Sequence, residues 1–198
     1  MDELVPFGSR GYCQLLMLLF FARGMDILST YVATPNLVLE GNPIAKKLGW
    51  RWGIVLNVAI SAALAFSQLS AIVVSTTSVL VAARNFQSAW LMRSLGEERY
   101  RDWHIARIQE TPITLFLFCL AGNTLPIAAV GAAIILFCPE KLGLIPFAIG
   151  VGIIAYAAAV VFYTLLAVWR LRRASDRKAR RFEAQANVFV DDGSGFVK

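Results

Sequence analysis

Long apolar stretches alternate with short polar connections along this chain. Four stretches reach the roughly 20 apolar residues that a helix needs to cross the hydrocarbon core of a bilayer. They lie at about residues 11–34, 52–82, 112–138 and 142–170. We therefore predict an all-α protein whose residues 1–170 form a four-helix transmembrane bundle. The first stretch begins after an acidic start and has no small-residue cleavage site, so we expect it to stay as a span.

The basic residues set the expected orientation. Four spans would place both termini on one side, together with the arginine-rich connection between the second and third spans. Because Lys and Arg concentrate in cytoplasmic loops, the sequence predicts an N-in, C-in topology. Residues 171–198 then form a basic cytoplasmic tail, which we expect to be flexible. A cluster of basic residues begins at Arg170, at the end of the fourth span, and continues into this tail. It is suited to attract anionic lipid.

The second stretch is longer than one span requires, since about 31 helical residues measure roughly 46 Å. We expect it to continue into the cytoplasm as a helical extension that ends at Gly96. Residues 97–112 mix charges with aromatic side chains, as an interfacial helix does, and a solvated connector is the alternative. In the third span Pro126 predicts a kink, which either lines a polar cavity or is accommodated by ordinary packing.

Composition supports the membrane class and excludes several others. The chain is 58% hydrophobic and 16% charged, which is unlike a soluble domain of this length. The net charge of +6 comes from residues that flank apolar stretches, so we expect no nucleic-acid partner. The three cysteines lack C-x-x-C spacing, which gives neither a zinc pattern nor a disulfide framework. No cofactor is expected.

Two charged residues lie in the middle of the first apolar stretch. Arg23, Asp26 and Thr30 recur at i, i+3 and i+7, so a helix presents them on one face. A charged side chain at the centre of a membrane helix costs roughly 2.5–3.5 kcal/mol on insertion scales. Two such charges predict a polar intramembrane site. They are equally consistent with an ion pair in which Arg23 and Asp26 neutralise each other and need no ligand.

The connection after the first span adds further oxygen ligands. Asn42 and Pro43 form an N-cap and N1 pair that opens a short helix, which Gly49 ends. Glu40 either interacts with the dipole of this helix or, together with Asn42, folds back over Asp26. In the second case Asp26 and Glu40 would be the ligands of a cation or would share a proton.

Polar residues of the second stretch form a stripe. Asn57, Ser61, Gln68 and Ser75 are spaced so that one helical face carries all of them. Asn57 and Ser61 fall at a depth similar to that of Asp26, and we predict that they face Arg23, Asp26 and Thr30. Hydrogen bonding that merely joins two membrane helices is the alternative interpretation.

These residues also carry a resemblance. The pattern Asp26-x-x-x-Thr30, then Glu40-x-Asn42-Pro43, then Gly49-Trp50 resembles a family of small prokaryotic multi-pass membrane proteins known as a domain of unknown function. The resemblance covers about a fifth of the chain. It implies a four-helix membrane protein in the plasma membrane of a prokaryote, with a shared polar site around Asp26 and Glu40. Arg23 lies outside that pattern, so its role rests on the physical argument alone.

Three functional classes remain open. The first is a protein that binds or permeates a cation, a proton or a polar head group through Arg23, Asp26, Thr30, Glu40, Asn42, Asn57 and Ser61. The second is a structural or assembly subunit, associated with other membrane proteins or with copies of itself, in which the Arg23–Asp26 pair is architectural. The third is an intramembrane enzyme that uses Asp26 and Glu40, which the sequence disfavours because it has no recognised catalytic motif.

Overall fold

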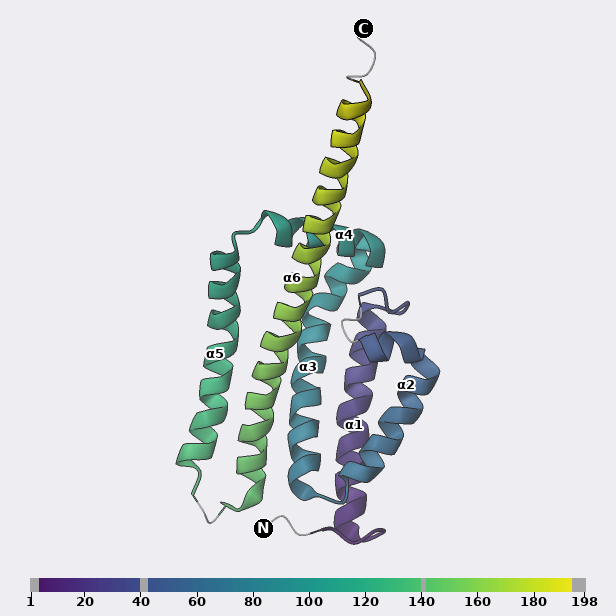
Figure 1. Ribbon diagram of the computed structural model, residues 1–198. Helices are drawn as coiled ribbons and strands as arrows, with labels where there is room; N and C mark the ends of the chain where they lie inside the picture. Colours follow the sequence, from purple (N-terminus) through teal and green to yellow (C-terminus); the bar gives the residue numbers. More distant parts are fainter. Residues whose placement is uncertain (1–3, 40–42, 140–141, 194–198) are drawn as a thin grey trace.

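The computed structural model describes residues 4–39, 43–139 and 142–193 of the chain. Figure 1 shows a bundle of upright helices with one helix lying across its end. In chain order the helices are α1 (Arg10–Ala33), α2 (Pro43–Leu64), α3 (Gln68–Leu95), α4 (Glu97–Glu110), α5 (Ile113–Phe137) and α6 (Leu144–Gly193). The predicted all-α class is confirmed.

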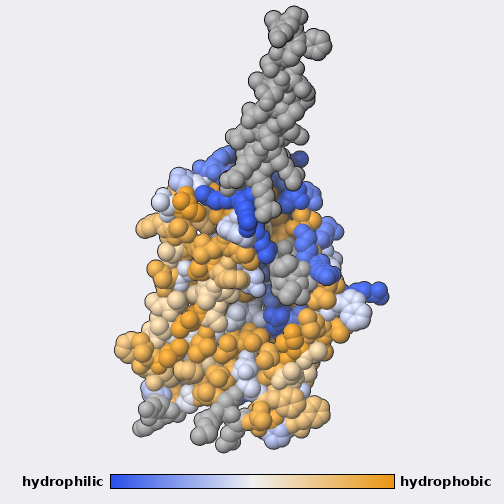
Figure 2. Space-filling model, viewed as in Figure 1, coloured by the Kyte–Doolittle hydropathy of each residue, from blue (hydrophilic) through white to orange (hydrophobic). Residues whose placement is uncertain are grey.

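Four of these helices are long and apolar enough to cross a membrane: α1, α3, α5 and the part of α6 over Leu144–Arg173. Their outer faces carry exposed large apolar side chains, such as Phe21 on α1 and Phe118 on α5. Figure 2 shows that hydrophobic residues cover the flank of the bundle, whereas hydrophilic residues gather at the end where α4 lies. Because water disfavours such a flank, the chain is an integral membrane protein with several spans.

The structure differs from the expected second span, because residues 52–82 are two helices. The chain reverses between Leu64 and Gln68, and Ser67 caps α3 by accepting a hydrogen bond from the Ser70 backbone N–H at 3.0 Å. The N-terminal segment supplies a hydrogen-bond donor to this corner, since the Val5 N–H donates to the Phe66 carbonyl at 2.9 Å. A serine N-cap inside an apolar run therefore begins a separate helix.

Helix α2 brings the chain back along α1. Its beginning lies at the C-terminal end of α1, because the Trp50 indole N–H donates to the Pro35 carbonyl at 2.8 Å. Gly49 has a φ of 67°, which breaks the helix after its first turns, as the sequence predicted. From Trp50 to Leu64 the helix is roughly 22 Å long, shorter than a bilayer core of about 30 Å. Helix α2 is thus a short, kinked return helix.

This return helix changes the topology. Helices α1 and α3 run in the same direction, and the start of α1 and the end of α6 lie at opposite ends of the structure in Figure 1. The N-in, C-in prediction placed both ends on one side, so it disagrees with this arrangement. The physical reason is the corner at Ser67, which adds one more traverse of the bundle than the apolar lengths indicated.

Small residues allow the central helices to approach closely. Helix α3 presents a buried stripe at heptad-like spacing, made of Ala71, Ser75, Ser78, Ala82 and Ala89, and it packs along α1. Helix α6 meets α3 and α5 at glycines: a Cβ at Gly152 would lie 2.8 Å from Thr76 Cβ, and one at Gly131 would lie 2.8 Å from the Gly150 carbonyl oxygen. Such contacts between backbones are typical of membrane helices.

The expectations for the remaining segments were met in part. Helix α3 ends at Leu95, with Gly96 at a φ of 79°, and the helix α4 follows, with Tyr100 and Ile108 buried; its interfacial position stays a prediction. Helix α5 continues through Pro126. Helix α6 continues into the tail as far as Gly193, and the flexibility of the tail stays a prediction. No glycine or proline interrupts residues 171–192, which are rich in helix formers.

Candidate functional site

The charged pair of α1 forms an ion pair inside the bundle. The Arg23 guanidinium donates to the Asp26 carboxylate through Nη1, with 3.2 Å between Nη1 and Oδ2. The two side chains retain 28% and 21% of their exposure. Helical spacing of i and i+3 places the two groups on one face, as the sequence predicted. The pair is therefore local to α1 and partly accessible.

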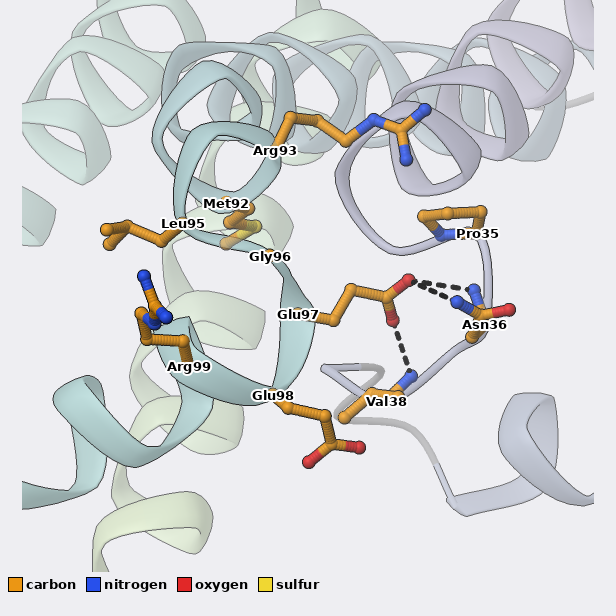
Figure 3. Close-up of a pocket in the computed structure, with 10 residues that line it drawn as sticks. All are labelled: Pro35, Asn36, Val38, Met92, Arg93, Leu95, Gly96, Glu97, Glu98 and Arg99. Carbon is orange, nitrogen blue, oxygen red and sulfur yellow. Dashed lines mark hydrogen bonds between the residues drawn. The ribbon is translucent and has the colours of Figure 1, made fainter.

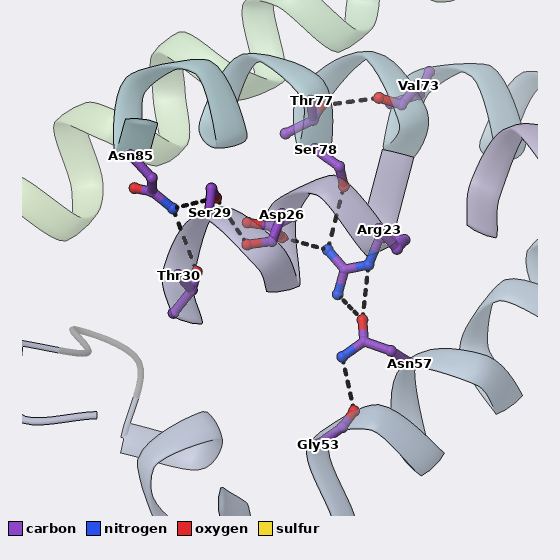
Figure 4. Close-up of polar contacts among 10 residues, drawn as sticks. All are labelled: Arg23, Asp26, Ser29, Thr30, Gly53, Asn57, Val73, Thr77, Ser78 and Asn85. Atoms are coloured by element: carbon purple, nitrogen blue, oxygen red, sulfur yellow. Dashed lines mark hydrogen bonds and ion pairs between the residues drawn. The ribbon is translucent and has the colours of Figure 1, made fainter. Parts of the chain in front are cut away.

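Arg23 also reaches the two helices that pack beside α1 (Figure 4). Its Nε donates to the Asn57 side-chain oxygen on α2 at 2.8 Å, and its Nη2 donates to the same oxygen. Its Nη1 also donates to the Ser78 hydroxyl on α3 at 3.3 Å. Asn57 is held in turn, because its amide N–H donates to the Gly53 carbonyl at 2.8 Å. One guanidinium thus joins three helices, and we call Arg23, Asp26, Asn57 and Ser78 the arginine network.

A second set of hydrogen bonds extends along the contact between α1 and α3. The Asn85 amide donates to the Ser29 hydroxyl at 3.2 Å and to the Thr30 hydroxyl at 3.4 Å. Ser29 is fully buried and donates to the Asp26 carbonyl at 2.8 Å. These bonds lie one to two turns beyond Arg23 along α1. They make this contact polar over roughly two helical turns.

The structure brings only some of the predicted site residues together. Asn57 contacts Arg23, and Thr30 lies on the same face but bonds to Asn85. Ser61 on α2 is buried, with 1% of its surface exposed. Glu40 and Asn42 lie outside the described residues.

Sequence reasoning missed Ser78 and Asn85. Ser75, Ser78 and Asn85 share one face of α3 at spacings of three and seven residues. The sequence predicted residues 52–82 as one helix. A single helix would carry the residues after Ser67 away from Asp26 and Thr30, so no contact with α1 was expected there. Ser67, as an N-cap inside the apolar run, is the sequence signal for a separate helix that starts there.

The geometry limits which ligand these groups can hold. The Asp26 carboxylate, the Asn57 amide oxygen and the Ser78 hydroxyl are oxygen ligands of the kind that hard cations prefer. The Arg23 guanidinium lies among them and bonds to each. A tethered cation therefore occupies the position in which a metal ion or a proton would be held. Within the described part of the chain, no group of three or more His, Cys, Asp or Glu side chains could hold a metal.

A second polar centre lies at the end of the bundle where α3 meets α4. The Glu97 carboxylate accepts hydrogen bonds from the Thr34 hydroxyl at 2.6 Å and from the Val38 N–H at 3.2 Å. It also accepts two bonds from Asn36, from the backbone N–H and the side-chain amide, both at 3.0 Å. Figure 3 shows Glu97 pointing into the loop that follows α1.

These bonds keep Glu97 charged. Partial burial raises the pKa of Glu97, but the hydrogen bonds from Thr34, Asn36 and Val38 outweigh it, so the pKa lies below its ordinary value. With four donors on two oxygens, the carboxylate has used its acceptor sites. Glu97 therefore anchors the loop after α1 to the start of α4. The sequence showed no signal for this contact, because the bonded residues are about 60 positions apart.

Comparison of the chain with protein-family models, with curated proteins and with solved structures found no match. The arginine network must therefore be interpreted from its own geometry.

Proposed function

We propose that this multi-pass membrane protein has a structural role in the membrane, in which the arginine network holds the return helix α2 against α1 and α3. The observation that carries the proposal is the distribution of the Arg23 bonds, which reach Asp26 on α1, Asn57 on α2 and Ser78 on α3. Away from water, each such bond lacks a solvent competitor, so a charged donor with three partners stabilises one arrangement of helices. This role fits a structural or assembly subunit.

A second candidate function is the binding of a polar ligand from the membrane. It is favoured by the exposure of Arg23 and Asp26, which keep 28% and 21% of their side-chain surface accessible although they lie between apolar spans. An exposed charge in hydrocarbon is costly, so water or a polar head group is expected to reach it. The network carries no net charge when Arg23 and Asp26 are both ionised, which favours a neutral or zwitterionic ligand over a free ion.

One experiment separates these two candidates. We would measure the thermal unfolding of the purified chain in detergent with and without sodium, magnesium and a short-chain zwitterionic lipid, for the wild type and for Asp26→Asn. A structural network predicts that Asp26→Asn lowers Tm by the same amount under every condition. A binding site predicts a wild-type Tm that rises with one ligand and an Asp26→Asn variant that does not respond. If Asp26→Asn unfolds like the wild type throughout, both candidates are wrong.

We also propose that the end of the bundle that carries α4 is cytoplasmic and that the N-terminus lies on the other side, in the plasma membrane of a prokaryote. The return through α2 brings Lys46, Lys47 and Arg51 to the end where α3 meets α4, since the Lys46 ammonium contacts the Val38 carbonyl at 3.5 Å. At the opposite end the described residues include Arg10 alone among basic side chains. This asymmetry supports the orientation through the positive-inside rule.

Cysteine labelling in intact cells tests the orientation. In a variant without the three native cysteines, Phe7→Cys reports the N-terminal end, and Ser94→Cys reports the α4 end; both positions are exposed. We expect a membrane-impermeant maleimide to label Phe7→Cys in intact cells and to label Ser94→Cys only after lysis. The reverse pattern, or labelling of both in intact cells, would contradict the proposed orientation.

A further inference from the structure

An open cleft of about 730 Å³ lies between the loop that follows α1 and the corner where α3 meets α4 (Figure 3). Its apolar wall is formed by Pro35, Val38, Met92 and Leu95, and charged side chains from the corner complete it. The volume is within the range of clefts that hold small ligands. The cleft is separate from the arginine network, whose residues do not line it.

The acidic side chains of the cleft are already paired. Glu97 accepts four hydrogen bonds from the loop after α1. Glu98 forms an ion pair with Arg101, with 2.7 Å between Oε2 and Nη2. A carboxylate that is satisfied in this way offers little to a cation and repels an anion less than a bare one. The cleft is therefore poorly suited to bind a metal ion.

The basic side chains of the cleft are available. Arg93 and Arg99 are exposed, and neither makes a hydrogen bond or an ion pair with any residue that the structure describes. In Figure 3 Arg93 extends from α3 toward the side of Pro35, and Arg99 lies on the other side of the cleft beside Leu95. Two guanidinium groups thus flank one cleft, and among the described residues their N–H donors have no acceptor. Such groups bind phosphate with high geometric complementarity.

The position of the cleft along the bundle indicates which class of ligand it binds. Trp90 on α3 and Trp103 on α4 are exposed close to the cleft in sequence, at 70% and 45%. Exposed tryptophans are enriched at the membrane–water interface, where the phosphates of lipid head groups lie. The cleft combines an apolar wall with cationic rims at this level. An amphipathic ligand with an anionic group would satisfy both.

We propose that this cleft binds a phosphate group through Arg93 and Arg99. The group belongs either to an anionic lipid, whose acyl chains would lie along the apolar flank, or to a soluble phosphate ester. In both cases the two guanidinium groups donate hydrogen bonds to phosphate oxygens while Glu97 keeps the cleft wall in place. This proposal depends on the membrane location of the protein and is independent of the role of the arginine network.

The test uses the full chain in a neutral detergent and measures Tm against three probes: sodium phosphate, dihexanoylphosphatidic acid and dihexanoylphosphatidylcholine. We expect dihexanoylphosphatidic acid to raise Tm by about 5 °C near saturation. Arg93→Gln and Arg99→Gln should each weaken the apparent Kd about 10-fold, since each removes a charged donor, and the double variant should not respond. All variants should keep the Tm of the wild type without ligand, because both side chains are exposed and have no partner among the residues that the structure describes.

Arg84→Gln is the matched control, since Arg84 is an exposed arginine of the same helix whose guanidinium has no partner among the described residues and lies outside the cleft. It should respond to dihexanoylphosphatidic acid like the wild type. A response to phosphatidic acid alone identifies a lipid source, and an equal response to sodium phosphate identifies the phosphate group itself. An equal effect of phosphatidylcholine, an equal loss in Arg84→Gln, or no response to any probe would overturn the proposal.

Discussion

Arg23→Leu is expected to destabilise the folded protein by about 3 kcal/mol. The substitution removes the donor of the bonds by which Arg23 joins Asp26, Asn57 and Ser78. Removing one partner of a buried ion pair typically costs 3–5 kcal/mol, because the other charge is left without compensation. The expected value is at the lower end of that range, since Arg23 and Asp26 are both partly exposed. Helix α2 should loosen first, because Asn57 is its side-chain link to Arg23.

Thermal unfolding in detergent measures this loss, and three variants show its origin. Arg23→Lys keeps the charge without the planar fork, so we expect a smaller loss of stability. The double variant Arg23→Leu, Asp26→Leu should recover much of the stability, since it removes the carboxylate together with the guanidinium that neutralises it. Arg84→Leu, on an exposed arginine of α3, should have little effect. An Arg23→Leu protein that unfolds at the wild-type temperature would rule out a structural network.

Gly152→Val should have an effect of similar size for a steric reason. A Cβ at Gly152 would lie 2.8 Å from Thr76 Cβ and 2.9 Å from the Val73 carbonyl oxygen, so α6 would have to move away from α3. That movement would also break the hydrogen bond from the Thr77 hydroxyl to the Gly152 carbonyl, now 3.0 Å long. Overpacking of this kind costs typically 1–3 kcal/mol, and more where both contacts are with rigid atoms.

Gly122→Val on α5 provides the control. A Cβ at Gly122 would meet nothing within 4 Å, and the residue is exposed. The same valine in the same kind of helix should therefore leave Tm within a few degrees of the wild type. Thermal unfolding of the two variants in detergent separates the effect of the contact between α6 and α3 from the effect of valine on helix stability. Equal losses at Gly122 and Gly152 would show that the close approach of α3 and α6 does not contribute to stability.

Much of the fold could be predicted because membrane helices leave strong local signals. The apolar lengths located α1, α5 and the membrane part of α6. Glycines with positive φ end helices where the sequence placed the ends, at Gly49 and Gly96. The break at Ser67 was missed because apolar length dominates a membrane prediction, whereas a single serine cap is worth only about 1 kcal/mol. Its other support comes from the N-terminal segment, through the bond between Val5 and Phe66.

The contacts of the candidate site were likewise predicted only in part from the sequence. Spacing along one helix determined that Arg23 and Asp26 would pair, because i and i+3 contacts depend only on helix geometry. The predicted contact with Asn57 is present, although the depth argument behind it assumed a single long helix. Ser78, Asn85 and the anchoring of the loop by Glu97 were not predicted, since each depends on which helices become neighbours.

The sequence by itself determined the membrane class, the apolar spans and the polar face of α1, because these follow from apolar length and from the period of a helix. Only the tertiary structure decided that α1 and α3 run in the same direction, that the start of α1 and the end of α6 lie at opposite ends, and that Arg23 joins three helices. The physical reason is the reversal at residues 65–67. A short corner, held by residues some 60 positions away, sets the direction of every later helix.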